Sequence, residues 1–176
     1  MFWLELKEFL SDMFKYILTA VIVILIILYV VSVQQVVGPS MSPTMENGEI
    51  ALLNKVKYHF SDIKRNDIVS LSYEDTKYLI KRVIGLPGEY IEYKNNILYV
   101  NEQGYKETFL SDEVKTEDFS LKDLGYDKIP EDMYLVLGDN REDSMDSRDI
   151  GLIKKEDIKG KVSLRIWPLN KGFIIK

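Results

Sequence analysis

A long uncharged apolar segment near the N-terminus constrains this chain more than any other feature. Residues 16–33 read YILTAVIVILIILYVVSV and contain no charged side chain, and thirteen of them are Ile, Leu or Val. As a helix they span about 27 Å, or about 33 Å if extended to Val37, which matches a bilayer hydrocarbon core of about 30 Å. We therefore predict a transmembrane helix over residues 16–37, preceded by a short segment of residues 1–15 and followed by a domain over residues 38–176.

Two other interpretations of this segment stay open: a buried helix of a soluble protein, and a cleaved secretory signal. The segment is longer than the usual core of a signal peptide, and no A-x-A site follows it. Lys7 and Lys15 precede it, and the next basic residue is Lys55. This bias favours a single-pass protein of the cell membrane with a cytoplasmic N-terminus and an extracytoplasmic domain.

The composition excludes several kinds of chemistry. The 176 residues include no cysteine and one histidine, so a thiol nucleophile, a disulfide and a Cys-ligated or multi-histidine metal site are impossible. His59 lies far from any small-residue turn, and we expect it at the surface with no part in catalysis. The net charge of −5 gives no basic surface that would indicate nucleic acid as a partner. We expect no metal and no other cofactor.

Beyond Val37 the chain shows the short β-rich runs and turn signals that are typical of antiparallel sheets. Residues 105–130 are polar and acidic, and we expect them to form a surface excursion with at most a short helical turn. Asn95 and Asn96 tolerate positive φ, so they predict a hairpin between two of the strands. Strands are predicted over residues 49–56, 67–73, 77–84, 89–93, 97–100, 133–138 and 161–167.

Three short motifs can carry chemistry, and the first directly follows the apolar segment. Residues 38–45 read GPSMSPTM. Gly38 and two prolines restrain the backbone around Ser40, so this serine can present its hydroxyl and offer its own N–H to an oxyanion. A linker turn beside the membrane has the same composition, and this alternative stays open.

The second motif places a lysine inside an apolar run. Residues 78–89 read YLIKRVIGLPGE, with Lys81 and Arg82 at its centre. On a strand these two side chains point to opposite faces, and both have apolar neighbours. A lysine that is desolvated in this way has a lowered pKa and can act as a general base. An ordinary half-exposed strand lysine is the alternative.

The third motif, residues 138–151, reads GDNREDSMDSRDIG and is dense in hydrogen-bonding groups. A calcium loop starting at Asp139 fails, because Arg141, Ser144 and Ile150 occupy positions that an EF-hand reserves for an oxygen ligand, Gly and Glu. A structural loop with an internal pair between Asp146 and Arg148 remains possible, and it is compatible with positioning an active-site lysine.

In this order, after one apolar segment, the three motifs resemble those of the type I signal peptidases, peptidase family S26, in their short Gram-positive form. Residues 40–44 match Ser-Met-x-Pro-Thr, residues 81–88 match Lys-Arg-x-x-Gly-x-Pro-Gly, and residues 138–148 match Gly-Asp-Asn-Arg-x-x-Ser-x-Asp-Ser-Arg. Weaker matches fall at residues 66–69 and 157–168, so the resemblance covers roughly residues 15–170.

The resemblance implies a serine endopeptidase with a Ser–Lys dyad. Ser40 would be the nucleophile and one oxyanion donor, and Lys81 the general base. Ser144 would hydrogen-bond Lys81 and orient it. The supporting loop would be held by Asp139, Arg141, Asp146 and Arg148.

The resemblance also leaves one oxyanion donor unassigned and suggests contacts around the nucleophile. Gly38 stands where some family members have a second oxyanion donor, a serine, so a backbone group or water would have to serve. We expect Gly38, Met41 and Pro43 to contact the substrate or the membrane.

The implied fold is mostly β, with antiparallel sheets similar to the self-cleaving domain of SOS repressors. The expected partners are signal peptides of exported preproteins and the lipid bilayer, while the oligomeric state is left open. Two functional alternatives remain. One is a specialised signal peptidase for a narrow substrate set such as pilins, and the other is a non-catalytic, membrane-anchored β adaptor.

Overall fold

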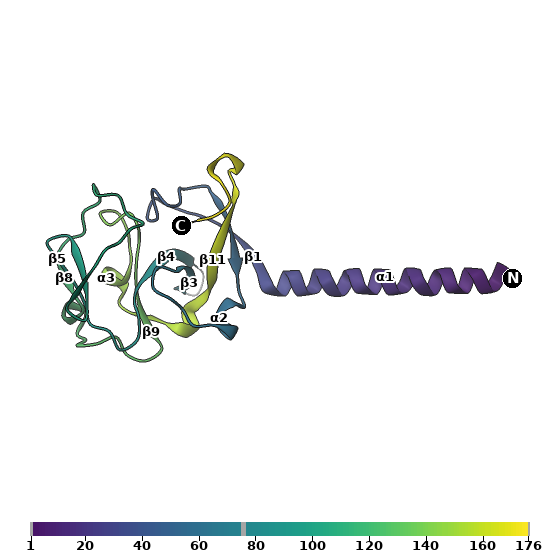
Figure 1. The fold of residues 1–176 in the computed structure, drawn as a ribbon, viewed down its shortest axis with the longest axis horizontal. Helices are drawn as coiled ribbons and strands as arrows, with labels where there is room; N and C mark the ends of the chain where they lie inside the picture. Colours follow the sequence, from purple (N-terminus) through teal and green to yellow (C-terminus); the bar gives the residue numbers. More distant parts are fainter. Residues whose placement is uncertain (1, 75–76, 176) are drawn as a thin grey trace.

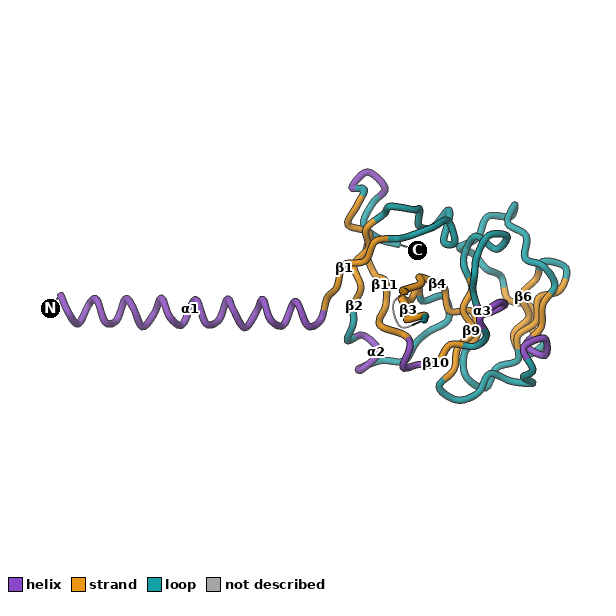
Figure 2. The backbone as a smooth tube through the Cα atoms, turned by 180° about the vertical axis from the view of Figure 1, so that it is seen from behind, coloured by secondary structure: helices purple, strands orange, loops and turns teal. Residues whose placement is uncertain are grey.

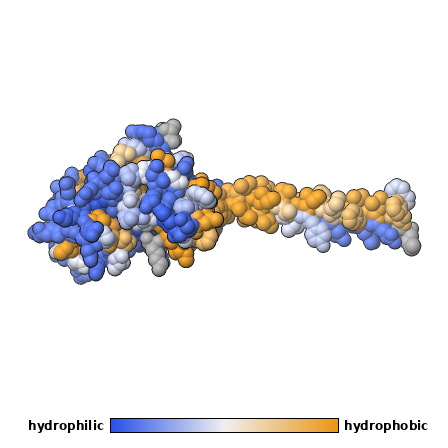
Figure 3. Space-filling view, turned by 90° about the horizontal axis from the view of Figure 1, so that it is seen from above, coloured by the Kyte–Doolittle hydropathy of each residue, from blue (hydrophilic) through white to orange (hydrophobic). Residues whose placement is uncertain are grey.

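One long helix projects from a β domain, as Figure 1 shows for the computed structural model. The structure describes residues 2–74 and 77–175, apart from the side chains of Leu4 and His59. Helix α1 runs over Phe2–Val30, and within its segment Glu5–Val30 an 18-residue window has a mean hydropathy of 2.5 with no part buried by the rest of the protein. This helix is long and apolar enough to cross a membrane, and its apolar surface stands out in Figure 3.

The helix starts well before residue 16, where we predicted it to begin, and ends at Val30, seven residues before the predicted end at Val37. It continues instead into strand β1, Val31–Gln35, which pairs antiparallel with strand β2, Ile50–Asn54. The helix end is fixed by Lys55, whose backbone N–H donates to the Val30 carbonyl at 2.9 Å and whose Nζ donates to the Leu28 carbonyl at 2.9 Å. These bonds satisfy carbonyls that a helix C-terminus leaves without partners, so the extension of the helix to Val37 is wrong.

The main sheet has seven strands in the order β1-β2-β11-β3-β4-β9-β10, and every neighbouring pair is antiparallel. The predicted strands fall on β2, β3, β4, β9 and β11, although β11 begins three residues early because it also pairs with β3. The remaining bounds are β3 Ile68–Tyr73, β4 Lys77–Gly85, β9 Met133–Leu137, β10 Ile153–Lys154 and β11 Ile158–Trp167.

The second sheet has four strands in the order β7-β6-β5-β8 and lies at the end of the domain away from α1 (Figures 1 and 2). The predicted hairpin is confirmed, with Asn95 and Asn96 at φ 51° and 64° between β5 and β6. The strand bounds are β5 Ile91–Lys94, β6 Ile97–Val100, β7 Gln103–Tyr105 and β8 Phe119–Ser120.

Residues 105–130 are mostly irregular, as predicted, but they are more than a surface excursion. Strand β8 adds to the second sheet, and the short helix η1, Leu121–Leu124, follows it. Leu121 and Ile129 are fully buried in the core formed with Ile91 and Leu135. The apolar side chains that anchor this segment are separated by polar stretches, so the sequence shows no periodicity that would reveal them.

Three apolar clusters fill the domain, and the predicted mostly antiparallel β class is confirmed. The cluster that matters for the site lies beneath the turn after β1 and includes Val36, Met41, Met45 and Ile80. The remaining helices are single turns: α2 Lys57–Phe60, α3 Ser147–Ile150, η2 Lys155–Asp157 and η3 Leu169–Lys171.

Candidate active site

Ser40 lies in a tight turn that follows β1. Gly38 takes φ 86°, and its N–H donates to Asn47 Oδ1 at 2.9 Å. The Pro39 carbonyl accepts the Ser42 N–H at 2.9 Å, which closes a turn around Ser40. The Ser40 side chain is half-buried, and its N–H makes no hydrogen bond within residues 2–74 and 77–175. The turn therefore leaves one backbone donor beside the serine hydroxyl.

The side chains around Ser40 separate into buried and exposed groups. Met41 is 1% exposed and packs in the core, so our expectation that it contacts the substrate or the membrane is wrong for its side chain. Pro43 is exposed and Gly38 is half-buried, which leaves both accessible. Val37 is 83% exposed. The difference in exposure between Val36 and Val37 follows from the alternating directions of neighbouring side chains after β1: the Val36 side chain points into the core and the Val37 side chain points to solvent.

Strand pairing brings the lysine motif to the same place. In the antiparallel register between β4 and β9, Arg82 faces Leu137, so Lys81 and Gly138 are the residues that come directly after the last pair of the two strands. A Cβ on Gly138 would lie 2.4 Å from the Ser40 carbonyl oxygen and 2.1 Å from Ser144 Oγ. Both contacts are impossible for a side chain, so only glycine fits. Gly138 is thus the point at which the Ser40 turn meets the third motif, directly after the strand that pairs with the lysine-bearing strand β4.

Lys81 lies in an environment that favours its neutral form. Its side chain is 1% exposed, and its amine makes no hydrogen bond or ion pair within the described part of the chain. Burial lowers the pKa of Lys81 to about 8; the nearby Asp146 carboxylate opposes this shift, and the Arg148 guanidinium adds to it. A lysine with this pKa is partly deprotonated near neutral pH and can accept a proton.

Ser144 does not make the contact that the resemblance implies. Its hydroxyl is buried and forms no hydrogen bond of full geometry with any described residue, Lys81 included. It is turned toward Gly138 and lies close enough to the Asp146 carboxylate to help lower the pKa of that group. Ser144 is therefore adjacent to the site, but the expected bond to Lys81 is absent from this structure.

Asp146 fixes the loop next to Lys81. It accepts the Gly138 N–H at 3.0 Å, and two bonds of 2.9 Å join it to Arg148. Burial alone would raise the pKa of Asp146, but the bonds from Arg148 and from the Gly138 N–H outweigh it, and the pKa is lowered. Asp146 is thus ionised, and the predicted pair with Arg148 is present.

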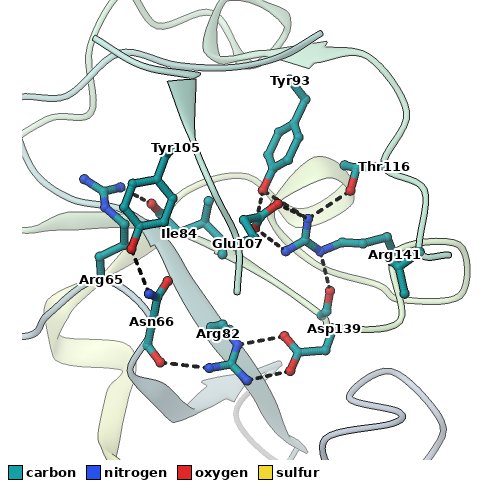
Figure 4. A network of polar contacts seen from close by, with 12 residues as sticks. Arg65, Asn66, Arg82, Ile84, Tyr93, Tyr105, Glu107, Thr116, Asp139 and Arg141 are labelled. Carbon is teal, nitrogen blue, oxygen red and sulfur yellow. Dashed lines mark hydrogen bonds and ion pairs between the residues drawn. The ribbon is translucent and has the colours of Figure 1, made fainter. Parts of the chain in front are cut away.

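Asp139 connects the Ser40 turn to the strand that carries Lys81. Arg82 donates to both of its carboxylate oxygens, at 2.8 and 2.7 Å, and the Thr44 hydroxyl donates to Oδ2 at 2.5 Å. Figure 4 shows the paired Arg82 and Asp139. Arg82 and Asp139 are almost completely buried, and the bidentate geometry satisfies both charges.

Arg141 holds the loop from the other side, against the second sheet (Figure 4). Its guanidinium donates to the Gly138 carbonyl at 2.9 Å, to Glu107 at 2.6 Å and to the Thr116 hydroxyl at 2.9 Å. A further bond of 3.0 Å reaches the Tyr93 hydroxyl. The supporting residues named from the sequence therefore lie in three separate ion pairs: Asp146 with Arg148, Asp139 with Arg82, and Arg141 with Glu107.

The comparisons with known proteins agree with this geometry. The family described as "Signal peptidase, peptidase S26" matches residues 10–167. The chain belongs to this family. It is 41% identical to Signal peptidase I P of Bacillus subtilis subsp. natto over 172 residues, which cover 94% of this chain and 93% of the relative. It is 37% identical to Signal peptidase IB of Staphylococcus aureus (strain COL), with the same coverage.

A solved structure of the same family shares the fold. The crystal structure of a signal peptidase I from Enterococcus faecalis V583 is 35% identical, with a TM-score of 0.53. It covers 58% of this chain, and the match covers 98% of the crystallised chain. The antiparallel β domain described above is therefore the fold of a signal peptidase.

Several residues that build this signal peptidase site lie outside the motifs. Glu107 and Thr116 come from the irregular segment 105–130, and Tyr93 comes from the hairpin. No local pattern in the sequence marks them, because they meet Arg141 only in the folded domain. The side chain of His59 lies outside the described residues, and its predicted lack of a catalytic part stays a prediction. Among the described residues, no group of three or more His, Cys, Asp or Glu side chains could hold a metal ion.

Proposed function

We propose that this family member removes signal peptides from exported preproteins, with Ser40 as the nucleophile and Lys81 as the general base. The observation that carries the proposal is the buried amine of Lys81 on β4, whose pairing with β9 ends at Arg82 and Leu137, directly before Gly138, against which the Ser40 carbonyl packs. A serine hydroxyl needs a neighbouring base to attack an amide. A desolvated lysine with a pKa of about 8 can serve as that base.

The reaction then follows from the groups at the site. Neutral Lys81 takes the proton of Ser40 as its oxygen attacks the scissile carbonyl, and the Ser40 N–H donates to the oxyanion that forms. The ammonium of Lys81 next gives its proton to the leaving amine, which leaves an ester on Ser40. Lys81 then activates a water molecule, which hydrolyses the ester and releases the signal peptide.

The supporting residues act through the loop that carries Ser144. Asp146 and Arg148 hold Gly138, and Asp139 and Arg141 hold the flanking backbone. We assign Ser144 to Lys81 as a partner that forms its hydrogen bond when substrate is bound, since catalytic hydrogen bonds often tighten only in the complex.

The substrate would bind as an added strand. Residues 77–81 of β4 pair with β3 on one side, while the pairing of β4 with β9 begins only at Arg82. The second edge of residues 77–81 is therefore open, within the described residues, to an extended peptide. Small side chains before the scissile bond, the A-x-A pattern of signal peptides, would bring the carbonyl close to Ser40.

We also propose that α1 anchors the chain in the cell membrane. Residues 1–15 would lie mainly on the cytoplasmic side, and the β domain from residue 38 onward would lie outside the cytoplasm. The exposed apolar surface of α1 supports this, because nothing in the described chain covers it. The lysine bias of the flanking segments supports the orientation.

The test is cleavage of a preprotein by the purified full-length chain in detergent. We expect one cut after the A-x-A site, loss of cleavage in Ser40→Ala and in Lys81→Ala, and wild-type cleavage in His59→Ala. Full activity in either of the first two variants would contradict the dyad. Binding of the preprotein without any cleavage by the wild type would instead favour the adaptor.

A further inference from the structure

Another buried ion pair, between Arg165 and Glu49, lies next to the turn that begins at Ser40. Arg165, on β11, donates from Nε to Glu49 Oε2 at 2.6 Å. Arg165 is 7% exposed and Glu49 3%. Buried charges are retained only where pairing and hydrogen bonds compensate their desolvation, so this pair fixes its surroundings tightly. The sequence singled out neither residue, because they are 116 positions apart.

The guanidinium of Arg165 also reaches the nucleophile turn directly. Its Nη2 donates to the Thr44 carbonyl at 2.5 Å, and its Nη1 donates to the Lys171 carbonyl at 3.1 Å. A planar guanidinium can serve a carboxylate and two carbonyls at once, whereas an ammonium has no such fixed fork. Arg165 therefore ties the end of the Ser40 turn to β11 and to the C-terminal segment.

Thr44 also makes a second hydrogen bond, through its own hydroxyl. Its hydroxyl donates to Asp139 Oδ2 at 2.5 Å, and Asp139 is paired with Arg82, the residue that follows Lys81. The turn that begins at Ser40 is thus held at Thr44 between two buried ion pairs. One of these pairs belongs to the strand that carries the lysine.

We propose that Arg165 is a positioning residue that acts through Thr44 and sets the distance between the Ser40 hydroxyl and the Lys81 amine. The inference rests on the proposed Ser–Lys mechanism. It adds two residues, Arg165 and Thr44, to those on which the rate of the chemical step depends. Neither touches the reacting atoms, so a change at either alters geometry and leaves the chemistry of the dyad unchanged.

The experiment uses the full-length chain in detergent and a preprotein substrate, with two variants. Arg165→Lys keeps the positive charge but loses the planar guanidinium with its fixed set of donors. The Glu49 carboxylate stays paired in this variant, because Lys171 Nζ already lies 3.0 Å from Glu49 Oε1. Thr44→Val keeps the shape and the carbonyl but removes the hydroxyl donor. Each should lower kcat by about 10- to 100-fold, the scale of a misplaced catalytic group, while KM stays within about twofold.

A matched control separates positioning from stability. Arg65 also binds a glutamate, Glu89, and a backbone carbonyl, that of Ile84, in a partly buried ion pair. Arg65→Lys should lower the melting temperature in the same way as Arg165→Lys, yet retain wild-type kcat. In all three variants the rising limb of the pH–rate profile should keep its midpoint near pH 8, because Lys81 keeps its surroundings.

The double variant Arg165→Lys/Thr44→Val decides whether the two residues act as one. If Arg165 works through Thr44, the double variant loses no more kcat than the worse single variant. Multiplied losses, a wild-type kcat in Arg165→Lys, or a loss confined to KM would overturn the inference. Cleavage by the wild type and none by Ser40→Ala would leave the proposed function intact in each of these cases.

Discussion

Lys81 is a cation that the fold keeps almost entirely away from water. Burial shifts its pKa to about 8, while an unfolded chain holds the same proton up to about 10.5. Activity should therefore rise with pH as Lys81 loses its proton, with a midpoint near pH 8 and a plateau above it. Measurement of kcat/KM between pH 6 and pH 10 tests this, and a flat profile over that range would rule out Lys81 as the base.

The same shift makes a prediction for stability. Between about pH 8 and 10.5 the unfolded chain binds the Lys81 proton and the folded chain does not, so wild-type stability rises with pH in this window. Lys81→Met removes the buried amine, so we expect an inactive protein that is more stable at pH 7 by about 1–3 kcal/mol. Chemical denaturation at pH 7 and pH 10 should show a smaller pH effect in the variant than in the wild type.

Gly138 is the residue at which the Ser40 turn and the Ser144 loop touch, and it tolerates no side chain. Gly138→Ala would force the Ser40 backbone and Ser144 apart, and we expect kcat to fall by about 100-fold. Gly104→Ala is the matched control, because its added Cβ would meet only Tyr99 at 3.9 Å, an ordinary contact. Equal activities of the two variants would show that the close approach at Gly138 is unimportant.

At the scale of single residues, the sequence identified the residues of the three motifs, but it did not identify the residues that form hydrogen bonds and ion pairs with them. Alternation in an apolar run placed Lys81 and Arg82 among apolar neighbours but left a half-exposed lysine as an alternative, and the structure buries both residues. Glu107 and Arg165 were not foreseen, because a polar residue in an irregular segment or on a strand looks the same whether it is solvated or paired in the core. The expected Ser144–Lys81 bond is absent: the Ser144 hydroxyl lies beside Gly138 and makes no hydrogen bond among the described residues.

At the scale of elements, the boundary between α1 and β1 shows a limit of pattern reasoning. Residues 31–35 are valine, serine and glutamine, and valine suits a helix in lipid as well as a strand. The strand forms because β2 offers partners for all five residues. The hairpin at Asn95, in contrast, was predictable, because its turn residues select the conformation locally and need no distant strand as a partner.

The irregular segment 105–130 acts as an element of the active site through Glu107. Glu107→Ala would leave the buried Arg141 without its carboxylate, and we expect a loss of about 3 kcal/mol in the free energy of unfolding. Glu113→Ala, at an exposed position of the same segment, should change stability by less than about 0.5 kcal/mol. Urea denaturation of both variants measures the difference, and equal stabilities would contradict a structural contribution of this ion pair.

At the scale of the whole molecule, the absence of cysteine from the sequence permits a direct test of the orientation in the membrane. Single cysteines in Lys7→Cys and Lys115→Cys, both at exposed positions, would lie on opposite sides of the bilayer. In intact cells, a membrane-impermeant maleimide should label the second variant only, and after lysis it should label both. Labelling of the first variant in intact cells would reverse the proposed topology.

The junction between helix and domain has no linker: α1 ends at Val30, β1 begins at Val31, and Lys55 bonds the last turn of the helix to the domain. With α1 in the bilayer, the height of Ser40 above the lipid is then fixed by the fold. Four flexible residues inserted between Val30 and Val31 should let the enzyme cut preproteins whose cleavage site lies unusually far from their own apolar segment. The anchor would thus make the enzyme selective for how far a peptide bond stands from the membrane, independently of the residues around that bond.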